Sequence, residues 1–131
     1  MNSISGHISN IQSEGSFQLI EIKAGKDSFK SIIIRNELEN YVNEDHVMLH
    51  FKENEVSIAL RKLEEISLQN QIEGRIKELQ KDQLLCRVVI QTEHGLISSV
   101  ITAASANRLR LELDRKVVAM IKTNEIMLSK L

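Results

Sequence analysis

The stretch HFKENEVSI, residues 50–58, and the stretch MIKTNEIML, residues 120–128, share one outline. Each has apolar residues, then a lysine, one variable residue, the pair Asn-Glu, and apolar residues again. The polar pair interrupts two β-type segments and favours a tight turn between them. The chain therefore encodes the same pair of closing strands twice, about 70 positions apart.

The repeat extends along the whole chain. At a shift of 68 positions, ISGHISNI (4–11) aligns with IEGRIKEL (72–79), and FKSIII (29–34) aligns with ISSVIT (97–102). The shift then becomes 70, as if the second copy had gained two residues after its helix. Identity is low, but pattern, order and spacing agree throughout, which indicates a tandem duplication.

Each copy is expected to be mostly β-structure. Alternating apolar and polar residues predict half-buried strands, and turn residues such as SEGS and TEHG separate them. A short helix is expected after the third strand of each copy, roughly from Glu37 to Tyr41 and from Ala103 to Leu111. Three strands, a helix and two strands in about 65 residues are typical of the barrel found in oligonucleotide/oligosaccharide-binding (OB) folds.

The predicted fold is therefore all-β, with two tandem OB-like five-stranded barrels that each carry one short helix. The predicted domains are residues 1–64 and residues 65–131. The segment RKLEEISLQNQ, residues 61–71, is expected to carry the chain from one barrel to the next.

The composition excludes several classes of function. The net charge is −1, which gives no electrostatic footprint for nucleic acid or an anionic membrane, and three Phe and one Tyr offer little surface for stacking bases. The single cysteine, Cys86, excludes an internal disulfide framework and is expected to be a small buried hydrophobic residue. No apolar run approaches the roughly 20 residues that span a bilayer, and no signal peptide is recognisable. We expect a soluble cytoplasmic protein with no nucleic-acid or membrane partner.

Catalysis and metal binding are not indicated either. The sequence has no Ser-His-Asp order, no HExxH motif and no phosphate-binding loop. The histidines His7, His46, His50 and His94 are scattered. His46 and His50 would face the same side of a strand, but without further obvious ligands. We expect no enzyme, no metal site and no cofactor.

Three segments of the second copy resemble a known family. They are SLQNQIEG (67–74), ITAAS (101–105) and IKTNEIML (121–128). They are similar to the opening motif, the stretch before the helix and the closing strand pair of the Mop (or TOBE) family of molybdate-binding domains. Two copies in one short chain resemble the di-Mop proteins, which bind and store molybdate in the cytoplasm.

The resemblance implies intracellular binding of a tetrahedral oxyanion, molybdate or tungstate, for storage, homeostasis or sensing. The alternative is a ligand-poor TOBE module that serves interaction or oligomerisation together with a molybdate transporter or regulator.

Molybdate is a dianion whose four oxygens only accept hydrogen bonds at neutral pH, so its site needs hydroxyls, amides, free backbone N–H groups and a cation. Thr102 can cap the helix expected from Ala103, which would leave N–H groups beside the hydroxyl of Ser105. A purely structural role is the alternative: Thr102 and Ser105 would only cap the helix, and Lys122 would be a solvated lysine at the end of a strand. The predicted oxyanion-binding residues are Ser67, Gln69, Asn70, Thr102, Ala103, Ser105, Lys122 and Thr123. The weaker first-copy candidates are Ser3, Ser5 and Lys52.

Two positions depart from the family pattern. Gln69 stands where the family has arginine, which replaces a cation with an amide donor. Glu125 stands where the family has serine, and the first copy has Glu55 at the same place. A carboxylate that faced a dianion would repel it. Glu125 is therefore expected to point away, or the closing-strand site is altered.

The first copy departs further from the pattern. Ile34 and Glu37 stand at the positions of Thr102 and Ser105. Asn36, with a glutamate three residues later, resembles a capping box that would occupy the N–H groups a ligand needs. We therefore predict that an oxyanion prefers the second copy.

The charge balance points the same way. Residues 1–66 hold 7 Lys+Arg and 11 Asp+Glu, a net charge of −4, whereas residues 67–131 hold 10 and 7, a net charge of +3. Each barrel is also small and poor in aromatic residues, so partner chains are expected to cover its edges. Di-Mop relatives form closed rings with ligands at subunit boundaries, and this resemblance implies a homo-oligomer, with a trimer ahead of a dimer.

Overall fold

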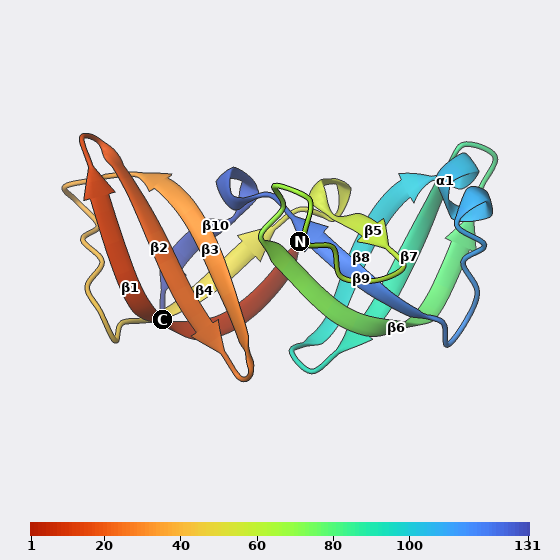
Figure 1. Ribbon diagram of the computed structural model, residues 1–131, viewed down its shortest axis with the longest axis horizontal. Coiled ribbons are helices and arrows are strands. Elements are labelled where there is room, and N and C mark those ends of the chain that lie inside the picture. The colour runs from red at the N-terminus through yellow and green to blue at the C-terminus, as the bar shows by residue number, and fades with distance from the viewer.

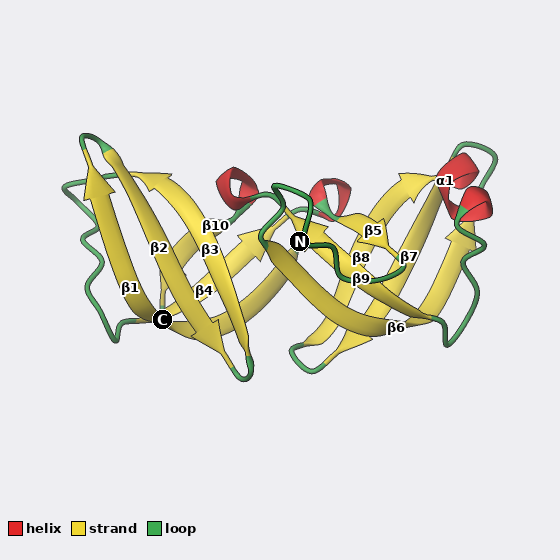
Figure 2. Ribbon diagram, viewed as in Figure 1, coloured by secondary structure: helices red, strands yellow, loops and turns green.

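The computed structural model describes all 131 residues and is built from β-strands. Two strongly curved five-stranded sheets lie side by side along the long axis of the molecule (Figure 1). The few helical turns lie at the rims of these sheets (Figure 2). No helix has the length and apolar character needed to cross a membrane. The elements in chain order are β1 (Asn2–Glu14), β2 (Phe17–Ala24), β3 (Asp27–Ile34), β4 (His46–Phe51), the 3₁₀ turn η1 (Glu53–Glu55), β5 (Ser57–Ala59), β6 (Asn70–Lys81), β7 (Leu85–Thr92), β8 (Gly95–Thr102), α1 (Ala103–Arg108), β9 (Lys116–Ile121), the 3₁₀ turn η2 (Thr123–Glu125) and β10 (Met127–Lys130).

The two sheets exchange their last strands. One sheet has the order β10-β4-β1-β2-β3, and the other has the order β5-β9-β6-β7-β8. Leu128 of the second copy therefore lies opposite Leu49 of the first, and Ile58 of the first lies opposite Ala119 of the second. The predicted all-β fold with two OB-like five-stranded units is confirmed. The predicted domains, residues 1–64 and 65–131, remain a division of the sequence into its two repeats, because each sheet contains strands from both of them.

Buried polar side chains join the two halves in matching pairs. The amide of Asn70 accepts from the N–H of Lys30 (2.7 Å) and donates to the same residue's carbonyl (2.9 Å). The amide of Asn2 makes the same two contacts with Ser98, both at 2.8 Å. Because Asn2 and Asn70 are repeat equivalents, the two contacts are related by the internal symmetry of the duplication.

The shared core explains why small curved sheets of this kind are stable. A single hydrophobic cluster of 23 buried residues runs through both halves. Each first strand bends over it at a bulge, between Ile8 and Asn10 in β1 and between Ile76 and Glu78 in β6. A Cβ atom on Gly74 would lie 2.6 Å from the carbonyl oxygen of Gln91. Only glycine allows this close approach of the crossing strands.

The structure corrects the helix prediction for the first copy. No helix forms between Glu37 and Tyr41; instead Asn36 closes a turn, with its backbone carbonyl accepting from Glu39 N–H (3.1 Å) and its side chain from Leu38 N–H (2.9 Å). The segment RNELEN has only Leu38 to bury, and Leu38 is 96% exposed. A one-turn helix without an apolar face has nothing to stabilise it.

The helix of the second copy forms, but it is shorter than predicted. Ala103 and Ala106 are buried on the inner face of α1, which packs it onto the sheet. The helix ends at Arg108 and does not reach Leu111, because Arg110 adopts a left-handed backbone conformation with φ of 53°. A residue in this region stops helical hydrogen bonding.

Candidate functional site

The repeated Lys-x-Asn-Glu phrase forms the same 3₁₀ turn in both copies, as the sequence indicated. The two turns differ in their glutamates. In η1 the carboxylate of Glu55 accepts a hydrogen bond from the backbone N–H of Lys52 (2.8 Å). In η2 the side chain of Glu125 makes no corresponding bond. The lysine of the first copy therefore has a carboxylate folded onto its backbone, whereas Lys122 does not.

Lys122 lies at an open, polar end of the second sheet. Asn70 pairs with Ile121, so Gln69 and Lys122 continue the two strands next to each other. Ser67, Gln69 and Lys122 are exposed, and Thr123 is half-buried. No carboxylate forms an ion pair with the ammonium group of Lys122. These groups can offer a positive charge, hydroxyls and an amide to an anion.

Asn70 has a different role from its neighbours. Its side chain is fully buried, and its amide also donates to the carbonyl of Ile121 (3.1 Å). Together with the two bonds to Lys30, this uses both amide hydrogens and the amide oxygen. A direct contact between Asn70 and an oxyanion would require one of these bonds to break. These bonds fix the start of β6, directly after Gln69.

The start of α1 forms the predicted helix cap. The hydroxyl of Thr102 accepts from the N–H of Ser105 (3.0 Å) and donates to its hydroxyl oxygen (2.9 Å). The N–H of Ala103 donates to the carbonyl of Leu84 (2.8 Å). The backbone N–H groups of Ala103 and Ser105, which were expected to bind a ligand, are therefore already hydrogen-bonded within the chain. The hydroxyl hydrogen of Ser105 is left without an acceptor in the chain and is the donor that this end offers.

The predicted residues fall into two groups that one chain does not bring together. The group around Lys122 adjoins the first residue of β6, whereas Thr102 lies opposite Leu85, beside the last residues of β6. A strand of this length extends over roughly 35–40 Å. In Figure 1, α1 lies at the outer end of the second sheet, while β9 leads back to the centre of the molecule.

Of the first-copy candidates, Ser3 and Ser5 lie on β1, and Lys52 follows β4 at the start of η1. Ser3, Ser5 and Lys52 are all exposed. The hydroxyl of Ser3 is hydrogen-bonded to Nδ1 of His50 (3.0 Å), and Nε2 of His50 is bonded to the hydroxyl of Ser129 (2.8 Å). His50 therefore joins three neighbouring strands, which engages Ser3 within the sheet.

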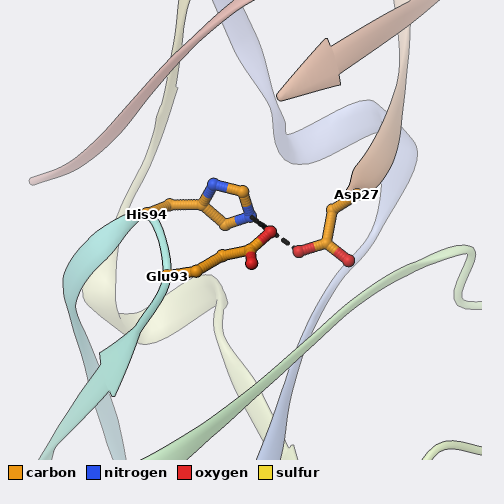
Figure 3. A group of neighbouring side chains, drawn as sticks. All are labelled: Asp27, Glu93 and His94. Carbon is orange, nitrogen blue, oxygen red and sulfur yellow. Dashed lines mark hydrogen bonds and ion pairs between the residues drawn. The ribbon is translucent and has the colours of Figure 1, made fainter. Parts of the chain in front are cut away.

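A cluster of titratable groups joins the halves where the sequence gave no signal. Nε2 of His94 lies 2.6 Å from Oδ2 of Asp27 and 3.6 Å from Oε1 of Glu93 (Figure 3). The three ligand-type atoms lie within 4.8 Å of one another, close enough to hold a cation. In this structure they are engaged with each other. The contact was not foreseeable from spacing, because 67 residues separate Asp27 from His94.

Three side chains have shifted pKa values, and none is among the predicted oxyanion-binding residues. Burial, together with a hydrogen bond to Glu39 and the charges of Glu39 and Asp45, raises the pKa of Tyr41 to about 12. The hydrogen bond and charge of Lys116 lower the pKa of Glu73. Burial raises the pKa of the Cys86 thiol, which is fully buried as the sequence predicted.

Comparison with known families identifies the second half. Residues 66–128 match the TOBE domain family. This part of the chain is a TOBE domain. It contains every predicted oxyanion-binding residue of the second copy, and its last strand, β10, pairs with the first sheet. The TOBE domain is therefore completed by β5, which the preceding half supplies.

Two solved structures are similar to this chain, one over its whole length and one over about half of it. The molybdate-bound form of the cytoplasmic molybdate-binding protein ModG is similar over 99% of this chain and 96% of its own, with a TM-score of 0.92 and 18% identity. MopII from Clostridium pasteurianum is 27% identical over 47% of this chain and 94% of its own, with a TM-score of 0.46. No curated protein matches this chain in sequence. The likeness to ModG establishes the shared two-sheet fold.

Proposed function

We propose that this protein binds a tetrahedral oxyanion, molybdate or tungstate, in the cytoplasm and catalyses no reaction. The proposal is supported by the TOBE domain of the second half and by the shared fold with a protein described as a cytoplasmic molybdate-binding protein. Storage, homeostasis or sensing of the anion is the role that such binding serves.

The observation that carries this proposal is the difference between the two closing turns. Glu55 occupies the N–H of Lys52, but the corresponding N–H at Lys122 has no side-chain partner. Hydrogen bonds to a charged acceptor are shorter and about twice as strong as neutral ones. A dianion would therefore be held at the second turn, by the ammonium of Lys122 with the amide of Gln69 beside it.

We also propose that the complete site needs more than one protomer. The donors at Thr102 and Ser105 lie at the far end of β6 from Lys122. The net charges of −4 on residues 1–66 and +3 on residues 67–131 favour contacts between opposite halves of neighbouring copies. A homo-oligomer, with a trimer ahead of a dimer, would use these contacts.

Calorimetric titration of the purified protein with molybdate, tungstate and sulfate tests the proposed function. We expect saturable heat with molybdate and tungstate and none with sulfate under the same conditions. Light scattering on the same sample tests the assembly. The absence of heat with all three anions would contradict oxyanion binding and favour a ligand-poor interaction module.

A further inference from the structure

The duplication brings the tips of its two equivalent β-hairpins together. The turn between β2 and β3 aligns with the turn between β7 and β8 at the shift of 68 positions, so that Lys26 is the equivalent of His94. The two tips lie next to each other and are joined by hydrogen bonds between the halves (Figure 1). Because the turns differ in sequence, one half supplies Asp27 to this junction and the other supplies Glu93 and His94.

Asp27, Glu93 and His94 direct their ligand atoms toward one another (Figure 3). Nε2 of His94 lies 2.6 Å from Oδ2 of Asp27 and 3.6 Å from Oε1 of Glu93. The ligand atoms of a tetrahedral zinc site lie roughly 3.3–3.5 Å apart, because each is about 2.0–2.2 Å from the metal. The contact between His94 and Asp27 would therefore have to open by less than about 1 Å to admit an ion.

Neighbouring groups hold these side chains in place. The N–H of His94 donates to the hydroxyl oxygen of Thr92 (3.0 Å), which fixes the turn, and the ring of His94 packs edge to face with the ring of Phe29. Oε1 of Glu93 accepts from the N–H of Lys26 (3.4 Å) in the opposite turn. A ligand set that is arranged before the ion arrives lowers the entropic cost of binding.

The charge and exposure of the cluster suit a cation. Two carboxylates converge on His94, and Lys26 is the only lysine or arginine that forms an ion pair with either of them. The side chain of Lys26 is 75% exposed and lies 3.8 Å from Glu93, so it can turn into solvent at little cost. The side chains of His94 and Asp27 are buried, whereas Glu93 is partly exposed. The ion would reach the cluster from the side of Glu93 and keep a water molecule as its fourth ligand.

The ligand types select the ion. Imidazole nitrogen suits Zn²⁺ and similar transition metals, whereas Mg²⁺ and Ca²⁺ prefer sites built from oxygen alone. We propose that Asp27, Glu93 and His94 bind a divalent transition-metal ion such as Zn²⁺, which joins the two halves of the chain. The ion takes the place of the proton that Nε2 of His94 shares with Asp27. This site shares no residue with the proposed oxyanion site and does not depend on it.

Calorimetry of the metal-free protein with Zn²⁺, Mg²⁺ and Ca²⁺ tests the proposal. We expect one Zn²⁺ to bind per chain at micromolar concentration, and no heat from Mg²⁺ or Ca²⁺ under the same conditions. The melting temperature should rise with Zn²⁺, because only the folded chain brings the three ligands together. Absence of saturable Zn²⁺ binding would overturn the proposal. Binding of Mg²⁺ as tight as that of Zn²⁺ would overturn the role of the imidazole.

Variants of the ligands locate the ion. Glu93→Gln keeps the pair between His94 and Asp27 and should weaken Zn²⁺ binding at least about tenfold, while His94→Gln should weaken it about a hundredfold or more. Lys26→Gln removes the competing ammonium group and should tighten binding about two- to fivefold. Unchanged Zn²⁺ affinity in Glu93→Gln, with an unchanged melting temperature in the absence of metal, would overturn the assignment.

The other pair of neighbouring histidines supplies the matched control. His7 and His46 lie opposite each other on β1 and β4, with ring centres 6.3 Å apart. His7→Gln removes an imidazole away from the hairpin tips and should bind Zn²⁺ as the parent does. Loss of Zn²⁺ binding in His7→Gln, with binding retained in His94→Gln, would place the ion at the other pair and overturn the proposal.

Discussion

At the scale of single residues, the buried amide of Asn70 joins the two halves of the molecule. Asn70 was recognisable as a polar residue next to a strand, and the resemblance suggested that it contacts a ligand. In the structure its amide is saturated by Lys30 and Ile121. The partner from the first copy comes close only because the two sheets share strands. Nothing within a few residues of Asn70 in sequence indicates that contact.

Replacement of Asn70 tests this structural role. Asn70→Ala would leave a buried N–H and two carbonyl groups of neighbouring strands without partners, and we expect a loss of about 2–3 kcal/mol in the free energy of unfolding. Asn40→Ala, which removes an exposed amide, should change stability by less than about 0.5 kcal/mol. Urea unfolding of both variants measures the difference. Equal stabilities would show that the buried amide is dispensable.

Tyr41 offers a pH test of the packing between the halves. Its hydroxyl donates to the carbonyl of Leu128 from the exchanged strand (3.1 Å), and burial raises its pKa from 10.0 to about 12. A raised pKa in the folded state contributes stability that is complete below pH 10 and is lost as the pH rises toward 12. Tyr41 is the one tyrosine in the chain, and tryptophan is absent.

The tyrosinate absorbance band therefore reports this side chain alone. We expect its titration midpoint near pH 12 in the folded protein and near pH 10 in denaturant. A midpoint near pH 10 while circular dichroism still shows the folded protein would contradict the packing of Tyr41.

At the scale of elements, alternation of apolar and polar residues located the strands, and turn residues located their ends. The helix prediction was confirmed for the second copy and was wrong for the first. ITAAS supplied both a capping hydroxyl and small residues that pack on the sheet, so α1 formed at Ala103. RNELEN resembled a capping box, but no apolar face followed it, and it formed a turn. A cap signal predicts a helix only when burial supports the turns behind it.

The cap itself can be tested at Thr102. Thr102→Val keeps the shape of the side chain but removes the acceptor for the N–H of Ser105, and we expect a loss of about 1 kcal/mol in stability. Thr102→Ser keeps the hydroxyl and should stay within about 0.5 kcal/mol of the parent. Thermal unfolding of the two variants checks this. Equal losses in both would mean that the methyl group, and not the cap, matters.

At the scale of the whole molecule, the duplication was visible in the sequence but the exchange of strands was not. Alternation shows that MLSK and SIA are strands, yet it does not show which sheet each one joins. The exchange ties two unequal halves together. The first half has a negative net charge and a turn in which Glu55 binds the N–H of Lys52. The second half has a positive net charge and a turn in which the N–H of Lys122 has no side-chain partner.

The central claim is that the oxyanion is held at the second closing turn and not at the first. Calorimetric titration with molybdate of two matched variants, Lys122→Gln and Lys52→Gln, tests it most directly. Both lysines are exposed at equivalent positions, so neither change should disturb the fold. We predict that Lys122→Gln weakens molybdate binding at least about tenfold, because it removes a charged contact, while Lys52→Gln binds as the parent does. Equal weakening in both variants, or unchanged binding in Lys122→Gln, would contradict the account.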